Sequence, residues 1–128
     1  MSSYPSWNLS EDLKSGNCTH LGGTNWQLPN QVDNYSFNLV DSKNVNQFLW
    51  FKKLQSLVTS VSIVYFTVYS NKLEPTDFAT YLAKKVTFGN NGNVTVDVQY
   101  VNSTTSSTGS NPVLSFNYYS YNKTSPSV

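Results

Sequence analysis

Residues 86–100 read VTFGNNGNVTVDVQY, and this stretch decides the fold class of the chain. The apolar residues at positions 94, 96, 98 and 100 alternate with Thr, Asp and Gln, which is the period-two pattern of a half-buried strand. The Asn-Gly pair that precedes this pattern is a strong signal for a tight turn. We therefore predict a β-hairpin whose two arms flank Gly89–Asn93.

Similar patterns lie on both sides of this hairpin. Residues 35–40 read YSFNLV and residues 114–119 read LSFNYY, so each segment predicts one further strand. Residues 57–70 read LVTSVSIVYFTVYS and are rich in β-branched and aromatic residues, which favour strands. Because bulky residues occupy both faces of this run, we expect a central strand covered on both sides, or covered by its partner sheet and by an N-terminal arm.

The best helix candidate lies at residues 75–84. Glu74-Pro75-Thr76-Asp77 places a proline and acidic residues in a first helical turn, where both are favoured. Phe78, Tyr81 and Leu82 would then share one helical face. Residues 48–51 read FLWF and are interpreted only as an apolar cluster before two lysines.

Six or seven strands spaced about ten residues apart, with at most one short helix, predict an all-β chain. We expect an antiparallel β-sandwich of jelly-roll or immunoglobulin-like topology. The chain is one domain with three parts. Residues 1–30 form an irregular N-terminal arm with one short strand near 24–28, residues 31–121 form the sandwich core, and residues 122–128 form a flexible tail. The Ser/Thr-rich residues 102–112 are expected to be a mobile loop.

Composition is unusual because charge is scarce. Charged residues make up 12% of the 128 residues, whereas about 25% is typical of a globular domain. Asn, Ser and Thr replace them, so attached sugar or burial in an assembly must shield this exterior. Asn-x-Ser/Thr triplets mark six candidate N-glycosylation sites. These are Asn8, Asn17, Asn34, Asn93, Asn102 and Asn122.

Several partners are not expected. All eight positive charges are Lys, and the absence of Arg argues against nucleic-acid binding. The longest apolar run, residues 54–69, is too short and too polar to span a bilayer. Cys18 and His20 are two metal-type ligands where zinc normally takes four, or three plus water, so we expect no metal and no cofactor.

Enzymatic activity is not expected either, so no catalytic residue is assigned. Histidine, the usual proton shuttle, occurs once, at His20 in a Gly-rich loop. No Gly-x-Ser-x-Gly pattern presents a nucleophile, and most acidic residues lie at expected turns or at the expected helix start.

Exposed aromatic residues favour an alternative function, a carbohydrate-binding or host-attachment β-sandwich module. Sugar rings stack on Trp and Tyr side chains, and Trp7, Trp26, Tyr118, Tyr119 and Tyr121 are candidates for such a platform. Tyr119 and Tyr121 are the most suggestive pair, because they share one face of a strand whose other face holds Leu114 and Phe116.

The low charge, the Lys without Arg and the run VTSVSIVYFTVY at residues 58–69 resemble surface and virion proteins of crenarchaeal viruses and cells. The resemblance is compositional and covers the whole chain. It implies a glycosylated β-sandwich or jelly-roll subunit that acts in a capsid, turret or filament, located in a virion or at the cell surface. Residues 1–7 lack the basic and apolar parts of a signal peptide, which favours a virion over a secreted filament. The leading expectation is therefore a non-enzymatic structural subunit whose partners are copies of itself or other structural subunits, with glycans as further partners.

Overall fold

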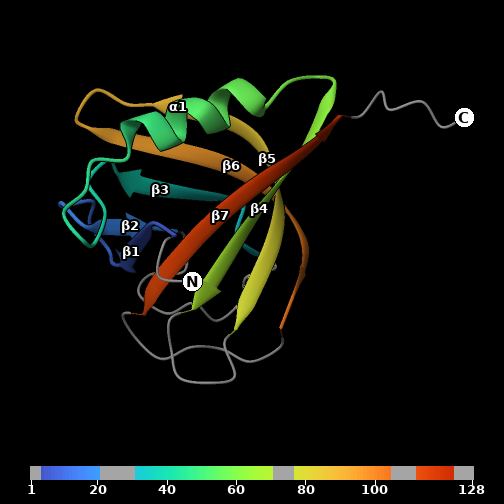
Figure 1. Ribbon diagram of the computed structural model, residues 1–128. Helices are drawn as coiled ribbons and strands as arrows, with labels where there is room; N and C mark the ends of the chain where they lie inside the picture. The colour runs from blue at the N-terminus through green and yellow to red at the C-terminus, as the bar shows by residue number, and fades with distance from the viewer. Residues whose placement is uncertain (1–3, 21–30, 71–76, 105–111, 123–128) are drawn as a thin grey trace, which may run out of the picture.

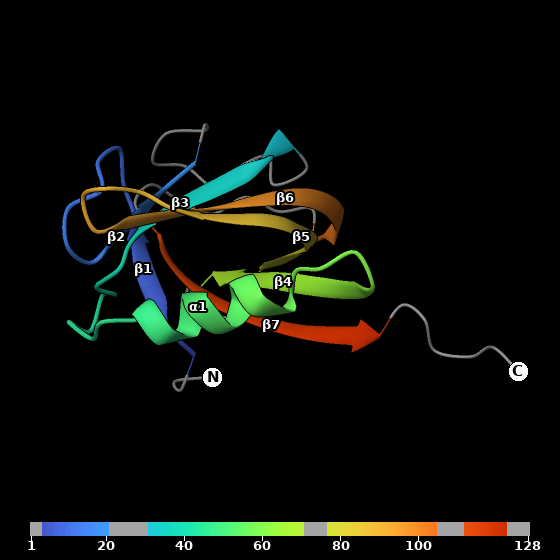
Figure 2. The same ribbon diagram turned by 90° about the horizontal axis from the view of Figure 1, so that it is seen from above.

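The computed structural model describes residues 4–20, 31–70, 77–104 and 112–122. Among these residues, seven strands close into a barrel and one α-helix lies across one end of it (Figure 1, Figure 2). In chain order the elements are β1 (Ser6–Leu9), β2 (Asn17–Thr19), β3 (Asn34–Asn38), α1 (Phe48–Leu57), β4 (Ser62–Ser70), β5 (Phe78–Phe88), β6 (Asn93–Ser103) and β7 (Val113–Asn122).

The strands follow one another around the barrel in the order β1-β2-β3-β6-β5-β4-β7, and β1 pairs with β7 to complete the circle. All neighbouring strands are antiparallel except β1 and β2, which run parallel. The prediction of a mostly β chain with one short helix is confirmed. The prediction of an antiparallel sandwich is wrong, because a single mixed sheet closes on itself.

Closure depends on the N-terminal segment that was expected to be an irregular arm. Trp7 of β1 pairs with Leu114 of β7, and Leu9 pairs with Cys18 of β2. β1 and β2 have only four and three residues, which is too short for a two-residue period to stand out in the sequence. The short strand expected near 24–28 lies outside the described residues, as do positions 105–111 of the expected loop and positions 123–128 of the expected tail.

The helix predicted at residues 75–84 is wrong. Residues 78–88 form β5, which pairs with β4 on one side and β6 on the other, and residues 75 and 76 lie outside the described residues. In β5 the buried residues Ala79, Tyr81 and Ala83 recur every second position. The hydrogen bonds and burial offered by two neighbouring strands override the local helix signals.

The helix forms instead in the segment that includes the apolar cluster. Phe51 and Leu54 are its buried residues, and their spacing of three puts them on one face of α1. The side chain of Asn46 accepts a hydrogen bond of 2.8 Å from the backbone N–H of Phe48, one of the donors that a helix start leaves without a partner. Gln55 Nε2 donates to the carbonyl of Val86 at 3.1 Å, which attaches α1 to β5.

The remaining strand predictions are confirmed. The hairpin of β5 and β6 turns at residues 89–93, where Gly92 has a φ of +75° and the N–H of Gly89 donates to the carbonyl of Asn93 at 2.8 Å. β3 and β7 occupy the two shorter alternating segments, and β4 occupies residues 62–70 of the long apolar run.

Aromatic side chains fill the barrel interior. The Phe37 ring centroid lies 4.8 Å from that of Trp7, 4.8 Å from that of Phe116 and 5.0 Å from that of Phe51. Aromatic pairs of this kind contribute about 0.5–1.5 kcal/mol beyond the area that they bury. Trp7 also donates its Nε1–H to the carbonyl of Asn38 at 2.8 Å, which satisfies its polar group inside the core.

Replacing Trp7 by Ala is expected to lower the free energy of unfolding by about 3–5 kcal/mol, because it opens a cavity at the closing strand. Urea denaturation followed by circular dichroism measures the loss. The control is Val101→Ala at a position that is 42% exposed, expected to change stability by less than about 0.5 kcal/mol. A loss for Trp7→Ala as small as the control's would show that β1 is not part of the cooperative core.

Tyr118 links β7 to the helix. Its hydroxyl donates to the carbonyl of Trp50 at 2.8 Å, and burial raises the pKa of Tyr118 to about 12. The folded state therefore holds this proton more tightly than the unfolded chain, whose tyrosine pKa is about 10. The stabilisation is complete below pH 10 and is lost as the pH rises through 12.

We therefore expect the free energy of unfolding to fall between about pH 10 and 12, with a shallower fall in Tyr118→Phe. Urea titrations of both proteins across this range measure the two slopes. Equal slopes would show that Tyr118 ionises alike in the folded and unfolded chains.

Candidate functional site

Three tyrosines gather on the outer face of two neighbouring strands, and we call them the tyrosine surface: Tyr65 of β4 with Tyr119 and Tyr121 of β7. Alternate residues of a strand point to opposite faces, and the inward positions of β4 are taken by buried residues such as Phe66. The side chains of Tyr119 and Tyr121 are 47% and 57% exposed. Tyr65 and Tyr119 are direct partners in the register of β4 and β7.

The three tyrosine rings lie in two orientations. The centroids of Tyr65 and Tyr119 are 5.4 Å apart with their planes inclined by 31°. The ring of Tyr121 stands nearly perpendicular to both, at 5.9 Å and 81° from Tyr65 and at 5.6 Å and 89° from Tyr119. The tyrosine surface therefore offers ring faces in two directions within a few ångströms.

Aromatic character continues along β4. Tyr4, from the N-terminal segment, stacks on Tyr69 with centroids 5.9 Å apart and planes inclined by 27°. Burial, together with the neighbouring Tyr4 and Tyr119, raises the pKa of Tyr69. The N-terminal segment thus covers the far end of this outer face, as one reading of the sequence expected, while Tyr119 and Tyr121 stay open to solvent.

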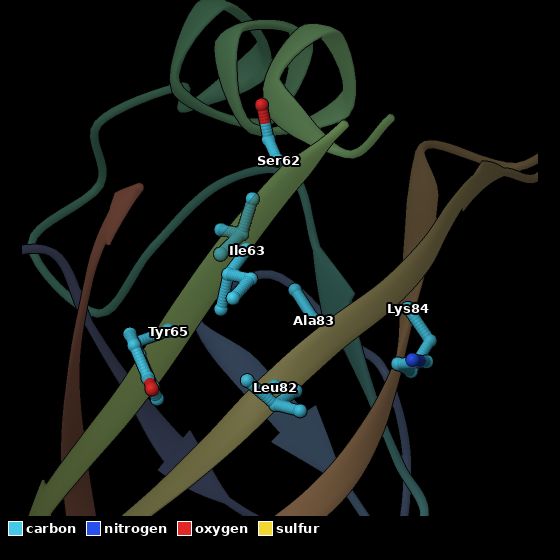
Figure 3. A pocket seen from close by; sticks show the side chains of 7 residues that line it. Ser62, Ile63, Tyr65, Leu82, Ala83 and Lys84 are labelled. Carbon is cyan, nitrogen blue, oxygen red and sulfur yellow. The ribbon is translucent and has the colours of Figure 1, made fainter. Parts of the chain in front are cut away.

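A pocket of about 280 Å³ adjoins the tyrosine surface on its other side, between β4 and β5. Tyr65 lines it together with Ile63 from the same strand, and Leu82 and Lys84 line it from β5 (Figure 3). We call it the β4–β5 pocket. Because Tyr65 belongs to both features, the pocket and the tyrosine surface form one continuous site across three strands.

The pocket exists because two paired strands separate. The β4–β5 ladder ends at the pair Tyr65 and Leu82, and no pair continues it to Ile63 or Lys84 within the described strands. On its other edge β5 has a register shift, in which Ala83 pairs with Val98 of β6 and Lys85 already pairs with the preceding residue of β6. Lys84 is therefore the extra residue of a β-bulge, and bulges bend a strand away from its neighbour.

The structure places the aromatic residues that were proposed from the sequence in different environments. Tyr119 and Tyr121 are exposed and lie together, as a platform requires. Trp7 is fully buried, and Tyr118 points inward, with its ring centroid 4.8 Å from that of Trp50. These two residues therefore do not contribute to an exposed platform, and Trp26 lies outside the described residues.

Sequence reasoning missed Tyr65, Leu82 and Lys84. Tyr65 has the same outward parity in β4 as Tyr119 has in β7, but a run with bulky residues on both faces does not show which face is left open. Leu82 and Lys84 were assigned to a helix, so their shared strand face was not considered.

The six candidate N-glycosylation residues all lie in strands and differ in exposure. Three of them are exposed, namely Asn8, Asn102 and Asn122. The other three are half-buried, namely Asn17, Asn34 and Asn93. Asn17 also donates its Nδ2, the atom that would carry a glycan, to Asp12 at 2.9 Å. The exposed group is therefore the more accessible to a glycosylating enzyme.

Cys18 and His20 lie close to the barrel interior. Cys18 is fully buried, and burial raises the pKa of its thiol. Burial lowers the pKa of His20, whose ring packs edge-on against Tyr35 at 5.9 Å. Across the part of the chain that the structure describes, no group of three or more His, Cys, Asp or Glu side chains is placed to hold a metal ion.

Comparison of the chain with protein-family models, with curated proteins and with solved structures finds no match. Within the described residues, no helix has the length and apolar character needed to cross a bilayer.

The Cys18 thiol is expected to react with Ellman's reagent at least about tenfold more slowly in the folded protein than in denaturant. The reason is that the folded protein buries the thiol and that burial disfavours the reactive thiolate form. The time course of absorbance in native and denaturing buffer measures the two rates. Equal rates would contradict the burial of β2 in the barrel.

Proposed function

We propose that the protein is a non-enzymatic structural subunit of a virion (capsid, turret or filament) or of another extracellular surface assembly, and that it acts by packing against copies of itself or other structural subunits. The observation that carries this proposal is an exposed apolar patch at helix α1. Leu49 is 78% exposed, Val45 49% and Phe48 42%. We call these three residues the helix patch.

The helix patch extends onto the neighbouring sheet. The ring centroid of Phe48 lies 5.4 Å from that of Phe88, and Lys52 Nζ lies 5.5 Å above the Phe88 ring. Apolar side chains thus continue from α1 to the end of β5, with a lysine at their border. An apolar core with a charged rim is the usual make-up of a surface that another subunit covers.

Because side chains fill the barrel interior, a partner would bind on the outside of the molecule. Large aromatic side chains occupy the space that a wider barrel would leave for a ligand. They belong to Trp7, Phe37, Phe51, Phe66 and Phe116. Contacts with partners therefore fall to the outer strand faces and to α1.

Scarce charge supports a location in a virion or at a cell surface. With 12% charged residues, the exterior depends on Asn, Ser and Thr for hydration. Glycans on Asn8, Asn102 and Asn122 would add hydration in the free subunit, and burial of the helix patch would remove apolar area in the assembly.

A second candidate function, carbohydrate binding or host attachment, is favoured by a separate observation. The open rings of Tyr119 and Tyr121 lie beside a pocket and away from the core, and the side chains of the helix patch do not line that pocket.

The purified chain is expected to form a defined oligomer or particle, and Leu49→Asp is expected to weaken its association by about tenfold or more, because burying a leucine is worth about 1.5–3 kcal/mol. Sedimentation velocity over a range of concentrations measures the distribution of species. The matched control is Val101→Asp, which adds the same charge at an exposed valine of β6.

Circular dichroism confirms that both variants fold. A wild-type chain that stays monomeric at the highest concentration reached would contradict the proposal. Equal effects of the two substitutions would contradict the role of the helix patch.

A further inference from the structure

We infer that the tyrosine surface and the β4–β5 pocket together form a glycan-binding site, whose ligand is a pyranose sugar of an oligosaccharide chain. This inference rests on the second candidate function and deepens it, and it does not depend on the helix patch or on subunit packing. Its basis is the combination, in one place, of open aromatic faces, a small pocket and polar groups at the pocket's rim.

The aromatic geometry suits a sugar ring. One face of a pyranose presents C–H groups that carry partial positive charge, and the face of a tyrosine ring carries partial negative charge. Tyr119 is the natural stacking surface, because it is 47% exposed and the ring of Tyr65 packs beside it at 5.4 Å. Tyr121, inclined by 89° to Tyr119, would form a side wall that limits how the stacked ring can turn.

The pocket supplies the second kind of contact. Ile63 and Leu82 provide apolar walls, and the polar residues Ser62 of β4 and Lys84 of β5 line the margin of the pocket (Figure 3). Sugar hydroxyl groups point outward from the ring edge, so a ring held between apolar walls presents them to such donors and acceptors. Ser62 can both donate and accept, and Lys84 can donate up to three hydrogen bonds.

The separation of the strands adds polar groups of the main chain. The β4–β5 ladder stops at Tyr65 and Leu82, so the backbone of Ile63 borders the pocket beyond the last pair of that ladder, while Ile63 stays paired with Tyr121 of β7 on its other edge. Backbone N–H and C=O groups at a widened strand gap are suited to fixing the orientation of a polar ligand.

Size separates a sugar from a protein partner. A volume of about 280 Å³ lies just below the range for drug-sized small-molecule sites, which is roughly 300–1,000 Å³. A stable protein interface instead covers about 800 Å² on each partner. The helix patch, whose side chains do not line this pocket, fits a protein partner better, whereas the pocket with its flanking tyrosines fits one or two sugar rings.

Heteronuclear NMR titration with chitotetraose, cellotetraose and mannotetraose tests the inference on the full-length chain. We expect at least one of these sugars to shift the amide signals of Tyr65, Tyr119, Leu82 and Lys84 in a saturable manner. Tyr119→Ala is expected to weaken that binding by about tenfold or more, in line with the roughly 1–3 kcal/mol found for stacking on aromatic residues. Tyr119→Phe keeps the ring face and is expected to retain most of the affinity.

Two further variants separate the contributions. Lys84→Gln removes the ammonium group from the pocket rim and is expected to weaken binding about threefold or more, since a charge-assisted hydrogen bond is replaced by a weaker neutral one. Leu49→Asp, in the helix patch, is expected to leave sugar binding unchanged, even where it abolishes self-association. Tyr121→Ala replaces Tyr119→Ala if the latter does not fold by circular dichroism.

The inference is overturned if none of the three sugars shifts these signals. It is also overturned if a sugar binds with equal affinity to the wild type, Tyr119→Ala and Lys84→Gln, or if a sugar shifts only signals of α1. Signals at the tyrosine surface that shift on self-association alone, and not with sugar, would assign the surface to a second copy of the chain instead.

Discussion

The structure depends on closure of the sheet through Trp7. Strand β1 is the element that touches both β7 and β2, so the ring of strands is complete only when its short segment is held in place. Packing of the Trp7 indole against Phe37 and Phe116 holds it there, and the hydrogen bond from its Nε1–H to Asn38 fixes the orientation of the ring. Closure pairs the N-terminal end of β7 with β1 and so shortens the free sheet edge, which is a general way to limit strand-to-strand aggregation.

A narrow barrel also decides which residues remain available for binding. Its interior admits one layer of large side chains, and the inward positions of β4 and β7 supply Phe66 and Phe116. The alternate positions must then face outward, whatever their chemistry. Tyr65 and Tyr119 therefore face outward as a direct consequence of how the core is filled, and the register of β4 and β7 brings them side by side.

The sequence was sufficient to predict strands whose apolar residues alternate over many positions. It was insufficient where barrel closure or tertiary contacts determined the secondary structure. The hairpin around Gly92 and the strand containing Phe116 follow from local alternation, and so does the pairing of Tyr119 with Tyr121 on one face. Strand β1 could not be recognised, because four residues show no clear period. Residues 78–84 carry helix signals that the two neighbouring strands override. The bulge at Lys84, which opens the pocket, therefore could not be predicted from the local sequence.

Neither exposed surface is explained by the needs of the fold. Leu49 is 78% exposed, and Tyr121 is 57% exposed on the outer face of β7, so polar replacements at either position would remove little buried area. The surrounding exterior is hydrated by Asn, Ser and Thr, against which clustered apolar and aromatic side chains carry a cost in water. The two clusters differ in chemistry and surroundings: the first combines aliphatic side chains with Phe48 at a helix, and the second consists of tyrosines beside a pocket at a strand separation. Two surfaces that the core does not require, and that differ in this way, support the proposal of two partners of different kinds, a protein subunit at the helix and a sugar at the strands.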